Sequence, residues 1–342
     1  MRKTRRGGGA NMVAVSYSTG YIASSTDGNT WASRTPNAFG GVNGVAYGNG
    51  LWVAVGTNEG NPSIKNVSTS SNGTTWIGQT SNAGINNISN VAYGKNSSGN
   101  GVWVMCGSNK FATSPNGTSW TACATNGGLD NAVINVAFGK DNLGADLWIG
   151  IGYASIAENT IVRSTDGGNS WVACATNGGI NSYGRGVAYG LDASGAGLWV
   201  AVGQPTTGGN AIAYSSNGNN WTACTNAQAD SLIYNNNCVA YGKDASGAGL
   251  WVIAGVASIS RYPIATSPDG INWTKRLVNT AFTNNVANSV AYGQDALGNW
   301  LWVAVGNGGN CIATSTNGTT WTGITSTGGL SINSTSGVAF KK

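Results

Sequence analysis

Short apolar runs rich in Val, Ile, Trp and Tyr recur along the chain, and clusters of Gly, Asn, Asp and Ser separate them. This alternation of short runs and turn-forming clusters is the pattern of β-strands joined by tight turns. No stretch of about ten residues shows the apolar spacing of an amphipathic helix. The sequence therefore predicts an all-β protein with very little helix.

The runs belong to a unit that occurs seven times. A complete unit contains a run of the form V-A-Y-G, a run of the form L-W-V-A-V-G, and a third run, typified by I-A-T-S, that leads into S-x-(D/N)-G-x-x-W and a fourth short run. The units recur about every 50 residues, a period typical of β-propeller blades. Radial stacking of blades buries both faces of each sheet, which explains why the runs are apolar on both faces. The V-A-Y-G runs begin at Val45, Val91, Val136, Val187, Val239, Val290 and Val338.

The two ends of the chain carry complementary parts of one unit. The first unit begins with M-V-A-V-S at Met12 and lacks a V-A-Y-G run, whereas the chain finishes with G-V-A-F at residues 337–340. We expect residues 338–340 to pair with residues 12–16, which would close the ring without a covalent bond. The predicted architecture is a seven-bladed β-propeller of four-stranded antiparallel blades over residues 12–342, preceded by a flexible, basic, Gly-rich arm at residues 1–11.

Tryptophan follows the same repeat. All but one of the 14 Trp residues open the second or the fourth strand of a unit. We expect these rings to be buried between blades, where their large apolar area stabilises the stack. Only Trp300 lies outside this register.

The S-x-(D/N)-G-x-x-W segment predicts a structural turn between the third and fourth strands. Its Asp or Asn can accept hydrogen bonds from the backbone of the turn, and its Gly allows a positive φ. Four of the seven copies carry Asn, which cannot serve as a carboxylate. The turn positions are Asp27, Asn72, Asn116, Asp166, Asn217, Asp269 and Asn317, followed by Trp31, Trp76, Trp120, Trp171, Trp221, Trp273 and Trp321.

These repeats, from about residue 12 to residue 340, resemble those of the Asp-box (BNR) propeller superfamily, which includes sialidases, sortilin-type receptors and photosystem assembly factors. The resemblance implies a propeller fold. It also implies that the turns lie on the face opposite the catalytic or ligand site. The motif is therefore specific for the fold and says little about activity.

The catalytic residues of a sialidase are missing from this pattern. Such a site needs three arginines, a Tyr activated by Glu, and an Asp, but outside the arm the chain has only Arg34, Arg163, Arg185, Arg261 and Arg276. Other glycosidases need two carboxyl groups about 5 to 9.5 Å apart, whereas the only glutamates, Glu59 and Glu158, fall in loops of non-adjacent blades. His is absent. We expect no catalytic residues and no enzymatic activity, with a sialidase-like glycosidase as the third-ranked alternative.

Four Asp residues recur in D-x-x-G turns between first and second strands, at Asp141, Asp192, Asp244 and Asp295. One carboxylate per loop is few against the six to eight oxygens that calcium takes. We expect these carboxylates to cap their own turns, and we expect neither a metal nor a cofactor.

A ligand site is expected on the face opposite the turns, where the loops are rich in Asn, Thr and Gly. Amides and hydroxyls beside aromatic rings suit sugars, whose hydroxyls form hydrogen bonds while their C–H faces stack. The alternative is that these loops only complete the blades of a structural scaffold. The candidate ligand-binding residues are Tyr153, Glu158, Tyr183, Arg185, Tyr234, Tyr262 and Phe282.

Composition argues against two kinds of partner, nucleic acid and a membrane. Charged residues make up only 8 % of the chain, and the formal charge of +5 comes from the arm and the last two lysines. The rest is nearly neutral, so no basic surface for nucleic acid is expected. No apolar run is long enough to span a membrane.

Six cysteines are present, and Cys123, Cys174 and Cys224 occupy equivalent positions of three units. Equivalent positions in neighbouring blades lie too far apart for a disulfide. Free thiols are therefore expected, which favours folding in a reducing compartment. Cys224 and Cys238 are the one pair that merits a test.

The arm, M-R-K-T-R-R-G-G-G, resembles the basic Gly-rich N-termini of large DNA virus proteins. Together with low charge and free thiols, this indicates a virion- or surface-associated propeller used in attachment, whose arm can dock on other virion proteins. A bacterial or phage adhesin would share most of these features. The leading hypothesis is a propeller that binds a glycan or a protein receptor, and the second is a purely structural scaffold.

Overall fold

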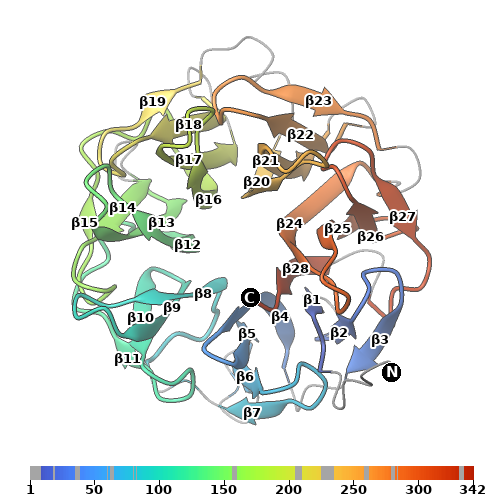
Figure 1. Ribbon diagram of the computed structural model, residues 1–342. Helices are drawn as coiled ribbons and strands as arrows, with labels where there is room; N and C mark the ends of the chain where they lie inside the picture. The colour runs from blue at the N-terminus through green and yellow to red at the C-terminus, as the bar shows by residue number, and fades with distance from the viewer. Residues whose placement is uncertain are drawn as a thin grey trace.

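The computed structural model describes residues 9–17, 20–34, 39–59, 61, 65–79, 81, 83–155, 160–204, 210–224, 235–257, 262–278, 282, 284–330 and 335–342. All regular structure in these ranges is β-strand, and the strands form antiparallel four-stranded blades arranged in a ring (Figure 1). Within the same ranges no helix is long and apolar enough to cross a membrane.

Each blade runs outward from the centre of the ring, and blades 1 to 7 are numbered here in chain order. The innermost strands are β28 (Thr335–Phe340), β4 (Gly41–Gly48), β8 (Asn90–Lys95), β12 (Ala132–Lys140), β16 (Tyr183–Leu191), β20 (Asn235–Lys243) and β24 (Val286–Gln294). The second strands are β1 (Met12–Ser16), β5 (Leu51–Thr57), β9 (Gly101–Gly107), β13 (Asp146–Tyr153), β17 (Gly197–Gln204), β21 (Gly249–Val256) and β25 (Trp300–Asn307).

The two outer positions of each blade hold shorter strands. The third strands are β2 (Ile22–Ser25), β6 (Val67–Ser70), β10 (Lys110–Ser114), β14 (Ile161–Ser164), β18 (Ile212–Ser215), β22 (Ile264–Ser267) and β26 (Ile312–Ser315). The outermost strands are β3 (Trp31–Arg34), β7 (Ile77–Gln79), β11 (Thr121–Ala122), β15 (Val172–Ala173), β19 (Thr222–Ala223), β23 (Thr274–Arg276) and β27 (Thr322–Ile324). These outer edges are short, which limits pairing with other chains.

Blade 1 is built from both ends of the chain, as predicted. Strand β28 pairs antiparallel with β1, so that Met12 lies opposite Phe340 and Ala14 lies opposite Val338. The last strand of the chain therefore supplies the innermost strand of the first blade, and backbone hydrogen bonds close the ring.

Ala10 and Asn11, which were assigned to the arm, are bonded to the blades. The backbone N–H of Ala10 donates to the carbonyl of Asn72 at 2.7 Å, and the N–H of Asn11 donates to the carbonyl of Ser25 at 3.0 Å. Ala10 is also buried. These residues pack against the turns of blades 1 and 2, and residues 1–8 lie outside the described part of the chain.

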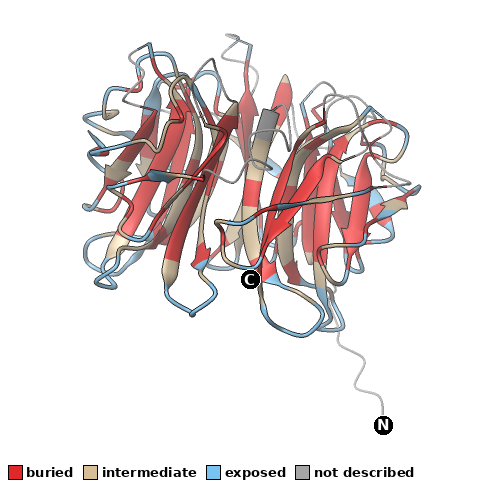
Figure 2. Ribbon diagram, turned by 90° about the horizontal axis from the view of Figure 1, so that it is seen from above, coloured by how far each residue is buried: buried red, intermediate tan, exposed pale blue. Residues whose placement is uncertain are grey.

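The core consists of apolar layers between neighbouring blades, and the buried strands of the blades are visible edge-on in Figure 2. One such layer joins Leu198 and Val200 of blade 5 to Trp251 of blade 6. The framework Trp residues are buried as predicted, whereas Trp300 is 52 % exposed. Several second-strand rings also bond across the layer. For example, Trp199 Nε1 donates to the carbonyl of Lys140 in the preceding blade at 2.7 Å.

The glycine of V-A-Y-G is the point of closest approach between blades. A Cβ placed on Gly190 would lie 2.2 Å from Cγ of Tyr241 in the next blade, a separation that real Cβ atoms do not reach. The same conflict with the following aromatic ring would arise at Gly48, Gly94, Gly139, Gly242 and Gly293. Since the obstructing atoms include Cβ and Cγ, at the base of the side chain, rotation of the ring does not remove the conflict.

Gly190→Ala should therefore destabilise the fold by about 3 kcal/mol or more, the upper range for overpacking a core. Gly195→Ala is the matched control, because φ is +85° at Gly195 but no atom lies within 4 Å of the place that a Cβ would occupy; only backbone strain of about 1 kcal/mol is expected there. Urea unfolding followed by Trp fluorescence measures both. Equal losses in the two variants would contradict the packing argument.

The predicted turn between third and fourth strands is present. In blade 6 the backbone N–H of Gly270 donates to Ser267 Oγ at 2.8 Å, and the N–H of Asn272 donates to Asp269 Oδ1 at 2.7 Å. Trp273 Nε1 closes the turn by donating to the carbonyl of Gly270 at 3.2 Å. Asn72 makes the equivalent backbone bonds in blade 2. An amide oxygen can thus take the place of the carboxylate as the acceptor in this turn.

The Asp copies of this turn should make stability depend on acid. Burial alone would raise the pKa of Asp269, but hydrogen bonds from Asn272, Ile271 and Ser267 outweigh it and lower the pKa to about 2. The stabilisation is therefore present above about pH 4 and is lost as the pH falls through 2. We expect Asp269→Asn to be less stable than the wild type at pH 7 and equally stable near pH 2, by urea unfolding at each pH. A difference that does not change with pH would contradict this.

The D-x-x-G carboxylates cap their own turns. Asp192 Oδ1 accepts the backbone N–H of Ser194 at 2.8 Å and that of Ala196 at 2.9 Å. Hydrogen bonds from Ser194 hold the pKa of Asp192 below its usual range. No group of three or more Cys, Asp or Glu side chains that could hold a metal occurs in the ranges described above.

The cysteines are free thiols that pack between blades. Cys123 Sγ donates to the carbonyl of Gly168 in the next blade at 2.9 Å, and Cys174 Sγ donates to that of Gly218 at 3.2 Å. Burial raises the pKa of each of these thiols to about 12. The proposed pair is separated: Cys224 contacts Gly270, whereas Cys238 contacts Val290 of the following blade.

Candidate functional site

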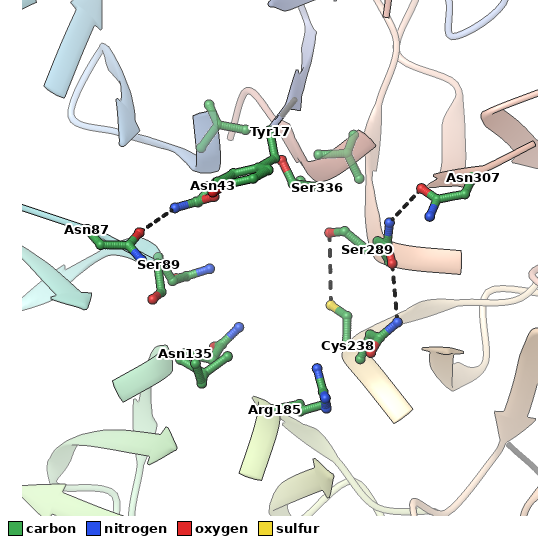
Figure 3. A pocket seen from close by; sticks show the side chains of 18 residues that line it. Tyr17, Asn43, Asn87, Ser89, Asn135, Arg185, Cys238, Ser289, Asn307 and Ser336 are labelled. Atoms are coloured by element: carbon green, nitrogen blue, oxygen red, sulfur yellow. Dashed lines mark hydrogen bonds between the residues drawn. The ribbon is translucent and has the colours of Figure 1, made fainter. Parts of the chain in front are cut away.

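A cavity of about 600 Å³ lies at one mouth of the central channel, where the innermost strands begin (Figure 3). Because the strands of each blade alternate in direction, the turns after the first and third strands lie at the opposite end of the molecule. The cavity is thus on the face for which the sequence predicted a ligand site. Its size is in the range of small-molecule sites.

One side chain from each blade lines the cavity at the same place in the repeat, two residues before the Val of V-A-Y-G. We call this set the mouth ring. Its members are Asn43, Ser89, Ile134, Arg185, Asn237, Asn288 and Ser336.

A β-bulge turns most of the mouth ring into the channel. In β16, Gly184 pairs with Gly203 and Gly186 pairs with Val202, so that Arg185 has no partner in the ladder. The register shifts in the same way around Asn43, Ile134, Asn237, Asn288 and Ser336. An extra residue in one strand breaks the alternation of side chains and re-aims one of them. In this fold it points that side chain into the cavity.

Four members of the mouth ring are committed to bonds with the next blade. Asn43 Nδ2 donates to the carbonyl of Ile88 at 2.8 Å, and Asn288 Nδ2 donates to that of Thr335 at 2.8 Å. Asn237 and Ser336 make the equivalent bonds, to Ala287 at 3.2 Å and to Val42 at 2.6 Å. Each acceptor directly precedes the next mouth-ring residue. Blades 6, 7, 1 and 2 are therefore joined to their successors in a continuous relay.

The remaining members, Ser89, Ile134 and Arg185, form an open arc across blades 3, 4 and 5. In the described part of the chain none of them donates to the following blade. Ile134 has no donor, and Arg185 Nη2 instead bonds Gln204 Oε1 of its own blade at 3.3 Å. Arg185 Nε is buried and has no partner among the described groups. Asn135, which also lines this arc, has a side-chain amide that bonds none of them.

The predicted site residues divide into three groups. Arg185 lines the cavity, and Tyr153 and Tyr183 lie behind it: the guanidinium carbon is 5.8 Å from the Tyr153 ring centre, and the two rings meet edge-on at 4.9 Å. Tyr262 does not line the cavity. Phe282 is only 1 % exposed and belongs to the core between blades 6 and 7, so it does not present its ring on this face. Glu158 and Tyr234, like Arg261, lie outside the described residues.

The other mouth-ring residues and Asn135 were not among the predicted site residues, although their place before V-A-Y-G is readable in each repeat. Tyr17, which follows β1, also lines the cavity and is 51 % exposed. Figure 3 shows Tyr17 and Arg185 on opposite sides of the cavity. The described lining contains no Asp, Glu or Lys. The cavity therefore offers amides, hydroxyls, one phenol ring and one cation.

The comparisons place the chain in one structural class. No family model matches it, and no curated protein matches it in sequence. Among solved structures, the BP39L lectin of Burkholderia pseudomallei is similar with a TM-score of 0.63, 12 % identity, and coverage of 92 % of this chain and 95 % of that chain. YCF48 bound to a D1 peptide is similar with a TM-score of 0.54, 12 % identity, and coverage of 90 % and 93 %.

The virginiamycin B lyase of Staphylococcus aureus is similar with a TM-score of 0.53, 12 % identity, and coverage of 91 % of this chain and 87 % of that chain. A lectin, a peptide-bound protein and a lyase thus share this backbone. The protein is a β-propeller, and at this identity the likeness establishes the fold alone, because function lies in sites carried by a fold.

A bonded residue of the mouth ring, Asn288, and a residue beside the open arc, Asn135, should respond differently to truncation. Asn288→Ala removes an inter-blade bond and a bond to Asn307 Oδ1, so we expect a loss of about 1 to 2 kcal/mol. Asn135→Ala removes no such bond and should change stability by less than about 0.5 kcal/mol. Urea unfolding of the two variants tests the distinction. A loss at Asn135 equal to that at Asn288 would show that the open arc is also structural.

Proposed function

We propose that this propeller is a non-catalytic protein that binds a glycan at the mouth of its central channel. The observation that carries the proposal is the cavity of about 600 Å³ that the mouth ring lines. Its lining supplies amide and hydroxyl groups from the blades. Neutral donors and acceptors in a concave site suit the hydroxyls of a sugar.

The exposed ring of Tyr17 supports a glycan over a purely structural role. An aromatic ring at the edge of a polar cavity provides a surface on which the C–H face of a pyranose can stack. The BP39L lectin shows that a backbone of this kind can carry sugar binding in another protein.

Attachment is the biological setting that we propose for this binding. A chain with 8 % charged residues and an Arg- and Lys-rich N-terminus suits a surface or virion component, with the arm free to engage other proteins of the particle. The absence of Asp and Glu from the described lining supports binding without turnover, since glycosidases use paired carboxyl groups.

A glycan array on the full-length protein tests the proposal, followed by affinity measurements on the best ligand. Tyr17→Ala should weaken binding at least tenfold because the stacking surface is lost. Tyr21→Ala is the matched control, since Tyr21 is similarly exposed in the same blade and does not line the cavity. Binding that both variants retain would place the ligand elsewhere. A folded protein that binds no glycan on the array would contradict the proposed function.

A further inference from the structure

We propose that the open arc, with Arg185 at one end and Asn135 in the neighbouring blade, is a subsite for the negatively charged group of an acidic saccharide, either a carboxylate or a sulfate ester. The proposal rests on the proposed function and adds the charge of the ligand and the place where that charge is held. Its chemistry is a fork of N–H donors next to neutral amides, which is suited to oxyanions.

The charge of the cavity favours an acidic ligand. Arg185 is the only charged side chain among the described lining residues. The one ion pair found among the described residues, between Lys140 and Asp146, lies elsewhere on the propeller. A positive charge in a concave site with low-dielectric walls attracts anions. The cavity therefore has a net preference for a ligand that carries negative charge.

The arc also contains N–H donors that an oxyanion could bind. Arg185 has five N–H groups, of which one bonds Gln204, while its buried Nε lacks a partner among the described residues. A buried donor without a partner is costly in a folded protein unless a ligand or water accepts from it. The amide of Asn135, contributed by blade 4, lines the same arc. An oxyanion in the arc would accept from both residues.

Neighbouring side chains hold the guanidinium of Arg185 in position. The Tyr153 ring packs against it with the cation 5.8 Å from the ring centre, and Gln204 holds Nη2. Tyr183 in turn packs edge-on against Tyr153. These contacts hold the long side chain in place before any ligand arrives, which lowers the entropy cost of binding. Tyr153 and Tyr183 are thus positioning residues, and Arg185 is the contact residue.

The inter-blade bonds on the other side of the mouth ring leave room for only one such subsite. In blades 6, 7, 1 and 2 the equivalent side chains donate to backbone carbonyls of the next blade. Only the arc of Ser89, Ile134 and Arg185 is free of such bonds in the described structure. One acidic group per propeller is therefore expected, despite seven repeats.

Isothermal titration calorimetry with the full-length protein tests the proposal, using three probes: an oligogalacturonate for carboxylate, a sulfated galactan oligosaccharide for sulfate ester, and a neutral galactan oligosaccharide. We expect one of the acidic probes to bind with 1:1 stoichiometry at least tenfold more tightly than the neutral probe. Arg185→Gln should remove this advantage, so that the variant binds the acidic and the neutral probes with similar affinity. Arg185→Lys, which keeps the charge but loses the fork, should give an intermediate affinity.

Arg276→Gln is the matched control, because it removes the same charge from the outermost strand of blade 6, where Arg276 Nε bonds Thr266 Oγ1. Unchanged melting temperatures confirm folding of each variant. Equal effects of the Arg185→Gln and Arg276→Gln changes, or equal affinity of acidic and neutral probes, would overturn the acidic subsite. If neutral sugars still bound in a manner sensitive to Tyr17→Ala, the proposed function would stand while this inference failed. Failure of every saccharide to bind would sink both.

Discussion

The contact between each blade and the next is the constraint on which the rest of the structure depends. An innermost strand can approach its neighbour only because the glycine of V-A-Y-G leaves room for the aromatic ring that follows in the next blade, as Gly190 does for Tyr241. The Trp of the second strand then fills the wider gap farther out, and in four blades it bonds back to the preceding blade. Since a ring closes only if every junction turns by a similar angle, the same residues recur at six of the seven junctions, and only blade 1 has Lys341 in place of the glycine. A residue that recurs at the same place in the blades therefore has a structural role.

Function is best sought where the repeat is broken. The β-bulge points one residue of an innermost strand into the channel, and in four blades that residue is an Asn or Ser bonded to the next blade. Ile134 and Arg185 occupy the same position and do not continue this relay. At one side of the mouth Arg185 thus keeps a donor that has no partner among the described residues, while Tyr17 presents an aromatic surface at the other side (Figure 3). The proposed ligand site thus arises from asymmetry within a symmetric scaffold.

Most of the fold could be predicted from the sequence, and the candidate site only in part. The strands, the turns with Asp or Asn as acceptor, the buried Trp residues and the pairing of β28 with β1 all follow from local patterns that repeat. The face that carries the cavity follows too, because strand order decides which loops share an end. Phe282 was placed on that face because it lies in a connecting loop. The structure buries it, since a loop can send one side chain back between the blades.

By itself the sequence determined what is local and periodic: the strands, their number in each blade, the turn chemistry and the closure of the ring. Only the tertiary structure decided which side chains meet in the channel. The mouth-ring residues are far apart in the chain, and their inward direction depends on bulges that interrupt the alternation by which strand faces are normally read. Whether the side-chain N–H of a residue such as Asn288 or Arg185 already has an acceptor depends on a group from another segment of the chain. No local pattern encodes such a relation.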